Sequence, residues 1–157
     1  MHTTGDQYLV KKINKSIVLE LIRHHSPLSR AKVSEISRLN KGTVSSLVGE
    51  LIESELVHEI GPGESSGGRR PLMLLFNNVA GYAIGIDLRV QELLGVLTDL
   101  QGMIIEEVQL PLLDPTYSSV LAQIESLIHT LISRATDSPH GIIGIGIGVP
   151  GTVDGEG

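Results

Sequence analysis

The sequence contains no cysteine and no tryptophan, and aromatic residues make up only 3% of its 157 residues. A chain without cysteine forms no disulfide, has no thiolate nucleophile and offers no cysteine-ligated metal site, which disfavours redox chemistry. The scarcity of aromatics leaves few platforms for stacking unpaired bases, which argues against single-stranded nucleic acid as the main ligand. The 41% of hydrophobic residues is that of an ordinary globular protein.

Long apolar runs are also missing. No run approaches the roughly 20 residues that a helix needs to span a bilayer. The start of the chain, residues 1–6, has neither the basic flank nor the apolar core of a signal peptide. We therefore expect a cytoplasmic protein without a membrane partner.

Positive charge is scarce in the second half of the chain. Residues 79–157 hold two Lys/Arg against ten Asp/Glu, whereas residues 1–78 hold ten against eight. The net charge of −6 is thus the sum of −8 and +2, and only the first half suits a polyanion. We expect two domains, 1–78 and 79–157.

The first half has the periodicity of helices. Residues 10–25 have apolar side chains at three- and four-residue spacing, which is typical of an amphipathic helix: Val10, Ile13, Ile17 and Leu21. Pro27 ends that helix, and Ser29 is a plausible N-cap for a short helix that runs to about Ser37. After a tight connector at 38–40, apolar residues at i, i+3, i+4, i+7 and i+8 predict a further helix: Val44, Leu47, Val48, Leu51 and Ile52.

A β-hairpin is expected next. The strand-like runs 56–60 and 72–76 flank the glycine-rich segment 61–71, which indicates an antiparallel pair with a long tip. The order helix, helix, turn, helix, hairpin is typical of a winged helix-turn-helix. The expected fold class is therefore α+β, with the hairpin as the wing.

The second half predicts an α/β layer. Strands are expected at 82–87, 92–98 and 103–110, and a buried strand at 142–149. Between them, Asp114 is a predicted N-cap and Pro115 a predicted first helical residue, before a helix through 120–132. The order βββαβ with continuous apolar strands favours a layered α/β domain.

A DNA-reading surface follows from the predicted helix of residues 44–52. If its apolar residues face the core, its N-terminal turn presents small polar side chains to a major groove. The candidate contacts on this turn are Lys41, Gly42, Thr43, Ser45 and Ser46. Gly49, in mid-helix, costs about 1 kcal/mol relative to alanine, so a close approach to DNA or to a neighbouring helix would explain it. The alternative is that these residues form only a solvated helix face.

The hairpin and the short helix add further candidates. Gly67 and Gly68 allow close backbone approach, and the adjacent Arg69 and Arg70 suit a narrow minor groove. At the start of the short helix, the predicted phosphate contacts are Arg30 and Lys32. The histidines show no metal-ligand spacing.

Five segments together resemble the ROK family (repressors, open reading frames, sugar kinases). They are LSRA at 28–31, NKGTVS at 40–45, SGGRRP at 66–71, GID at 85–87 and GIGVPG at 146–151. Within that family the sequence is most similar to the xylose repressors of Gram-positive bacteria. The resemblance implies a winged-helix domain, followed by an actin-like, sugar-kinase-type domain that is truncated here.

The resemblance also implies partners. It implies a homodimeric repressor that binds double-stranded operator DNA and releases it when a sugar, such as xylose, binds. It places the sugar site and a structural zinc in parts of the family fold for which this sequence has no matching residues. We therefore expect no cofactor in this chain, and weak or no sugar binding.

The alternative is a sugar kinase of the same family with an N-terminal extension. Such a kinase would carry glycines and a threonine after its first-strand aspartate, to cradle ATP phosphates. Here Asp87 is followed within three residues by Arg89 and Val90. We therefore expect Asp87 to be a vestigial phosphate or metal position, or a simple strand-end residue, and the protein not to be an enzyme. A third alternative is a winged helix that contacts only other proteins.

Overall fold

The computed structural model describes residues 4–62 and 71–151, and the side chains within them except those of 4–6 and 62. The chain divides into two compact units, Met1–Asn77 and Asn78–Gly157, each of which mixes helices and strands. Across the described ranges, no helix combines the length and the apolar character that a membrane span requires.

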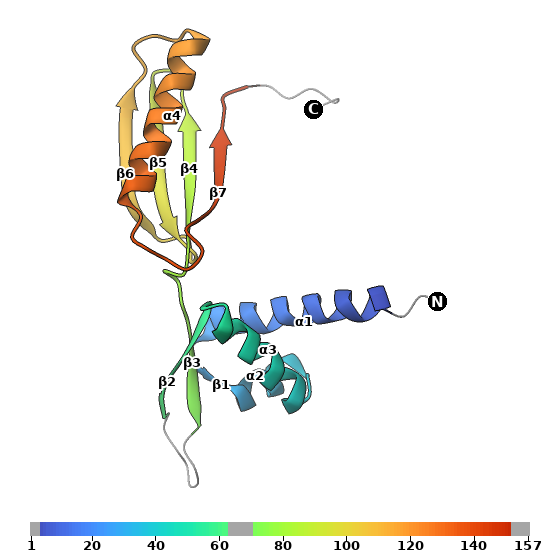
Figure 1. Ribbon diagram of the computed structural model, residues 1–157. Coiled ribbons are helices and arrows are strands. Elements are labelled where there is room, and N and C mark those ends of the chain that lie inside the picture. Colours follow the sequence, from blue (N-terminus) through green and yellow to red (C-terminus); the bar gives the residue numbers. More distant parts are fainter. Residues whose placement is uncertain (1–3, 63–70, 152–157) are drawn as a thin grey trace. The chain divides into compact units, whose positions relative to one another are not determined.

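The first unit packs helices against a small antiparallel sheet (Figure 1). Its helices are α1 (Thr4–His25), α2 (Arg30–Ser37) and α3 (Lys41–Glu53). Its strands are β1 (Leu28–Ser29), β2 (Val57–Pro62) and β3 (Leu72–Phe76). In the sheet, β3 lies between β1 and β2, and both pairings are antiparallel.

Helix α1 turns an unexpected face to the core. Val18 and Ile22 are fully buried, whereas Ile13 and Ile17 of the regular apolar stripe are 49% and 42% exposed. The reason is that α2, α3 and β3 all pack against the Val18 side. The periodicity correctly predicted the helix, but the most regular stripe is not the face that packs.

The expected hairpin is present, and it is joined by a strand that the periodicity did not predict. Val57 pairs with Phe76 and Ile60 with Met73, so β2 and β3 form the antiparallel pair. Leu28 and Ser29 then pair with Leu74 and Met73 on the other side of β3. A strand of only two residues has no readable alternation, so only the tertiary pairing reveals it.

The second unit is a mixed sheet with one helix on it (Figure 1). Its elements are β4 (Tyr82–Leu88), β5 (Glu92–Asp99), β6 (Ile104–Pro111), α4 (Tyr117–Arg134) and β7 (Ile142–Gly148). The strand order is β6-β5-β4-β7. The pairs β4/β5 and β5/β6 are antiparallel, and α4 makes the crossover that lets β7 run parallel to β4.

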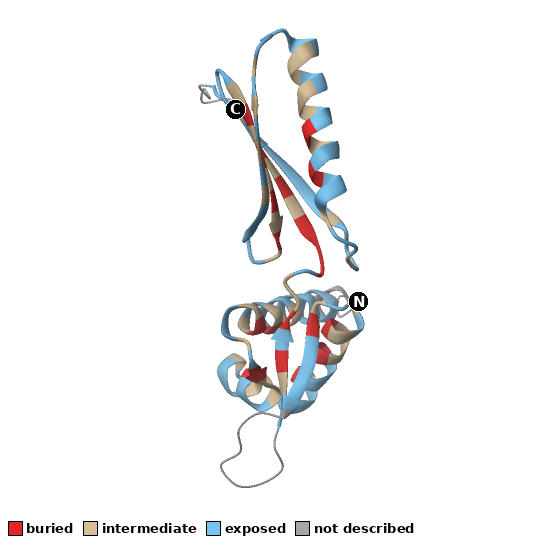
Figure 2. Cartoon of the chain, turned by 90° about the vertical axis from the view of Figure 1, so that its left-hand side faces the viewer, coloured by how far each residue is buried: buried red, intermediate tan, exposed pale blue. Residues whose placement is uncertain are grey.

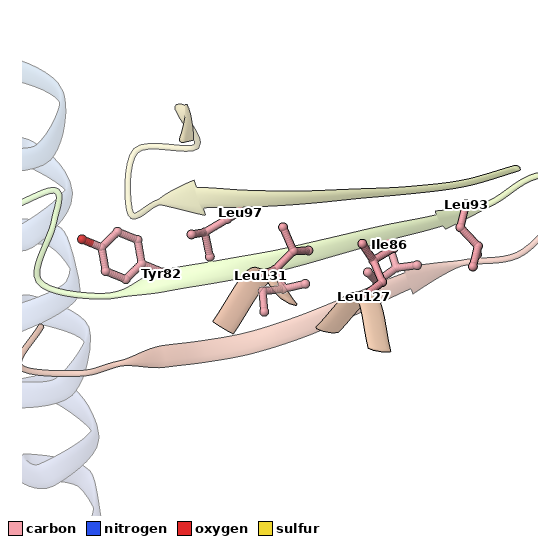
Figure 3. Packing of buried hydrophobic residues seen from close by; sticks show 7 residues of the cluster. Tyr82, Ile86, Leu93, Leu97, Leu127 and Leu131 are labelled. Atoms are coloured by element: carbon pink, nitrogen blue, oxygen red, sulfur yellow. The ribbon is translucent and has the colours of Figure 1, made fainter. Parts of the chain in front are cut away.

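The core of the second unit lies between α4 and one face of the sheet. Leu127 and Leu131 of α4 are buried against side chains of β4 and β5, including Ile86 and Leu97 (Figure 3). Gly95 lies directly under the helix, because a Cβ there would be 2.9 Å from Leu127 Cγ. This glycine thus sets how closely α4 approaches the sheet.

Three expectations for the second unit are wrong. Helix α4 begins at Tyr117 with Thr116 at its N-cap, so Asp114 is not the cap and Pro115 is not the first helical residue. The carboxylate of Asp114 instead accepts hydrogen bonds from the backbone N and Oγ of Thr116, at 3.0 and 2.9 Å. A side chain that accepts from the backbone N–H two residues later forms an Asx-turn, which is an alternative to capping the helix.

Strand β7 is not buried. Ile143, Ile145 and Ile147 are 60%, 46% and 50% exposed (Figure 2). The reason is that β7 is an edge strand and α4 covers β4 and β5 more than β7. A continuous apolar run predicts a strand but does not say how many of its faces are covered.

Candidate nucleic-acid interface

Helices α2 and α3 are joined by a short turn whose caps are well defined. Ser29 caps α2 by accepting from the backbone N of Lys32 at 3.2 Å, as the sequence predicts. Arg38 takes a left-handed conformation, with φ of 60°, which ends α2 and turns the chain. Asn40 then caps α3, because its Oδ1 accepts from the backbone N of Thr43 at 2.8 Å.

The two faces of α3 are chemically distinct. The four apolar residues predicted to face the core are buried: Val44, Leu47, Val48 and Leu51. On the other side Lys41, Gly42, Ser45 and Ser46 are exposed, and Thr43 is half-buried. The structure thus brings the candidate DNA contacts of α3 together around its N-terminal turn.

Gly49 has no packing reason within the first unit. A Cβ added at Gly49 would meet no heavy atom within 4 Å. Close approach to a neighbouring helix, one of the two reasons considered for this glycine, is therefore wrong. Close approach to DNA stays a prediction.

Arg30 is less available for a phosphate than expected. Its Nη2 lies 2.7 Å from Glu59 Oε1, and its Nη1 donates to the backbone O of Ser45 at 3.4 Å. Because Glu59 belongs to β2 and Ser45 to α3, this guanidinium ties the start of α2 to both elements. Its charge is already balanced, so a positioning role fits the observed contacts better than a free phosphate clamp.

The other predicted cations differ from Arg30. Lys32 pairs with Glu35 one helical turn away at 2.8 Å, an exposed pair that contributes little to stability. Lys41 is exposed and makes no ion pair with the described residues. The predicted wing-tip contacts lie outside the described residues: Gly67, Gly68, Arg69 and Arg70.

Asp87 lies next to the last residue of β4 and forms an ion pair with Arg89. Arg89 Nε lies 2.8 Å from Asp87 Oδ2, and the same guanidinium also bonds Glu92. The hydrogen bond that Arg89 donates to Asp87, followed by the one that it donates to Glu92, raises the pKa of Arg89 above its usual value. The arginine that the sequence predicts to obstruct a nucleotide is thus hydrogen-bonded to the aspartate. Among the described residues no group of three or more His, Asp or Glu is placed to hold a metal ion.

Comparison with known proteins shows which family and which relatives the chain resembles. Residues 83–157 match the profile of the ROK family. The "Xylose repressor" of Bacillus spizizenii (strain ATCC 23059 / NRRL B-14472 / W23) is 50% identical over 150 residues, which are 96% of this chain and 39% of that protein. The "Xylose repressor" of Bacillus subtilis (strain 168) is 48% identical over 151 residues, again 96% and 39%.

The chain belongs to the ROK family. A solved relative is the crystal structure of a ROK family transcriptional regulator described as a homolog of E. coli MLC protein, with a TM-score of 0.69 and 28% identity. That alignment covers 94% of this chain and 37% of the relative. This ROK chain therefore spans well under half of the length of these relatives, and its α+β fold agrees with that of the solved regulator.

Sequence reasoning about this ROK protein missed two features of the candidate interface. The periodicity places Asn40 only in a connector, although Asn three residues before Thr43 is a readable N-cap signal. Glu50 on α3 lies 2.6 Å from Lys11 Nζ and 3.2 Å from Lys15 Nζ of α1. No local pattern could reveal this contact, because it spans more than 30 residues and depends on how α1 crosses α3.

Proposed function

We propose that this chain carries the DNA-binding region of a sugar-responsive transcriptional repressor, and that α2, α3 and the β2–β3 hairpin act as a winged helix-turn-helix. The observation that carries the proposal is α3 itself. Its apolar face is buried, and its N-terminal turn presents to solvent hydroxyls and Lys41, which forms no ion pair with the described residues. A helix of this kind, preceded by a tight turn and followed by a hairpin, fits the major groove of double-stranded DNA.

Each exposed residue of α3 has a role suited to its chemistry. Lys41 supplies an ammonium for a phosphate, while Ser45 and Ser46 donate to or accept from base edges or phosphate oxygens. The Asn40 cap holds the backbone of this turn in place. In the wing, Arg69 and Arg70 stay the predicted minor-groove contacts.

The relatives suggest the regulated genes. Because the two Bacillus proteins are named xylose repressors, we propose that this protein represses sugar-utilisation genes and that xylose is the inducer. In this proposal a homodimer binds a palindromic operator in the cytoplasm, and the residues from 79 onward belong to a sugar-kinase-like sensor without kinase activity. The Asp87–Arg89 ion pair supports the last point, because Arg89 occupies a carboxylate oxygen of Asp87 that a metal ion would need.

The proposal is tested by selecting binding sites from a random duplex library with the whole chain. We expect enrichment of related half-sites. Ser46→Ala should weaken binding to the selected duplex by about 5- to 150-fold, the equivalent of about 1–3 kcal/mol for one base contact. Ser126→Ala, at an exposed serine of α4, is the matched control and should leave binding unchanged.

Two outcomes would overturn the proposal. If no duplex is enriched and no salt-dependent DNA binding is measurable, the winged helix serves another purpose, such as protein contact. If the protein transfers phosphate from ATP to xylose or glucose with measurable turnover, the kinase alternative is correct.

A further inference from the structure

Three lysines of α1 gather beside the candidate DNA-reading helix. Lys11, Lys12 and Lys15 lie within five residues of one another, and together with Tyr8 and Glu50 they line a surface pocket of about 210 Å³. Lys11 and Lys15 bond the two carboxylate oxygens of Glu50, at 2.6 and 3.2 Å. These hydrogen bonds, that of Lys11 first, lower the pKa of Glu50 and keep it ionised.

The cluster carries excess positive charge. Elsewhere in the described part of the first unit, each ion-paired arginine or lysine has a carboxylate that it shares with no other arginine or lysine, as in Arg30–Glu59 and Lys32–Glu35. Here Lys11 and Lys15 share the single carboxylate of Glu50, and with Lys12 beside them the local charge is +2. Lys12 is exposed and makes no ion pair with the described residues. Holding α1 against α3 would need only Lys11 and Lys15, so it does not account for Lys12.

The position of Glu50 places this charge along the candidate interface. Ser46 and Glu50 are four residues apart on α3, so they are neighbours on one helix face, with a rise of about 6 Å between them. The lysines that reach Glu50 therefore lie alongside the face that carries Ser46. A major groove is only about 12 Å wide and both of its walls are phosphate backbone. When a helix enters the major groove by its N-terminal turn, the later turns of that helix lie next to one of the two phosphate backbones.

We propose that Lys11, Lys12 and Lys15 form a phosphate-binding patch through which α1 grips the DNA backbone beside the groove that α3 enters. The inference rests on the proposed function and adds a contact surface on α1 to it. Glu50 is a positioning residue that holds two of the ammonium groups against α3. The patch recognises phosphate oxygens and not bases, so it contributes equally to every sequence.

The test is the salt dependence of binding to a fluorescein-labelled duplex of about 30 mixed-sequence base pairs, titrated between about 50 and 200 mM KCl. Each lost lysine–phosphate contact should lower the slope of log K against log salt by about 0.9 in magnitude. Lys12→Gln is the main variant, because its side chain is exposed and outside the Glu50 bridge. Lys11→Gln combined with Lys12→Gln should lower the slope by about 1.8.

The matched control is Arg23→Gln, which removes one positive charge from the same helix. Residue 23 lies 11 residues beyond Lys12, about 16 Å along the helix and further than a Debye length at these salt concentrations. We expect its slope to equal that of the unaltered protein. Far-ultraviolet circular dichroism and melting temperature verify that each variant is folded.

The outcomes separate this inference from the function on which it rests. If the unaltered protein binds the duplex and both lysine variants keep its slope, or if Arg23→Gln lowers the slope equally, the patch does not exist. If the unaltered protein binds no duplex, the proposed function fails first. A slope lowered only by the lysine variants, together with retained half-site preference, supports the patch.

Discussion

Replacing Gly95 with alanine is expected to destabilise the second unit, because the added methyl group has no room beneath α4. A Cβ at this position would lie 2.9 Å from both Leu127 Cγ and Cδ2, and 3.0 Å from Cδ1. Leu127 is only 1% exposed and packs within the main cluster of the unit, so its side chain cannot swing away without opening the core (Figure 3). Overpacking of this kind costs about 1–3 kcal/mol.

Calorimetry of the whole chain measures this effect. For a unit of about 80 residues, each kcal/mol lowers the melting temperature by about 4–8 °C, so the transition of the second unit should move by at least that much. Gly144→Ala on β7 is the matched control, since a Cβ there meets no heavy atom within 4 Å. Its effect should stay within about 0.5 kcal/mol. If the second unit of Gly95→Ala had the same melting temperature as that of the unaltered protein, close packing of α4 on β5 would be refuted.

Two further perturbations test the first unit. Asn40→Ala removes the side chain that caps α3 and should cost about 1 kcal/mol in the free energy of unfolding, whereas Asn40→Asp, which keeps an acceptor for the Thr43 amide, should cost much less; chemical denaturation measures both. The pKa of Glu50 is lowered from 4.5 by hydrogen bonds from Lys11 and Lys15, so its stabilising effect is complete above about pH 4.5 and is lost as the pH falls through its lower folded value. The melting temperature of Glu50→Gln should therefore fall less between about pH 5 and 3 than that of the unaltered protein. Equal falls in the two melting temperatures would contradict this interpretation.

Features that depend on short stretches of chain were predictable from the sequence. Helix α3 is the clearest case, because its apolar residues recur at helical spacing and the structure buries Val44, Leu47, Val48 and Leu51 as that spacing requires. The Ser29 cap and the β2–β3 pairing also follow from local signals. The candidate residues at the start of α3 depend on the same local periodicity.

Features that depend on which neighbour covers a surface were not predictable. The stripe of Ile13 and Ile17 is as regular as any in the chain, yet α2 and α3 pack on the Val18 face of α1. In the same way, the apolar run of β7 lies at an edge of the sheet and leaves Ile145 exposed. Periodicity describes one element alone, whereas burial is a property of two surfaces in contact.

From the sequence alone one can read most of the helices and strands of this chain, though not β1, the excess of positive charge in its first half, and its resemblance to ROK proteins. These follow from residue spacing, composition and motif order, which are properties of the chain before it folds. The long-range partners of the charged groups depend on the folded chain. The fold pairs Arg30 with Glu59 and gathers lysines of α1 around Glu50 of α3. Attraction between charges acts over a few ångströms of space, and the fold sets those distances for residues far apart in the chain.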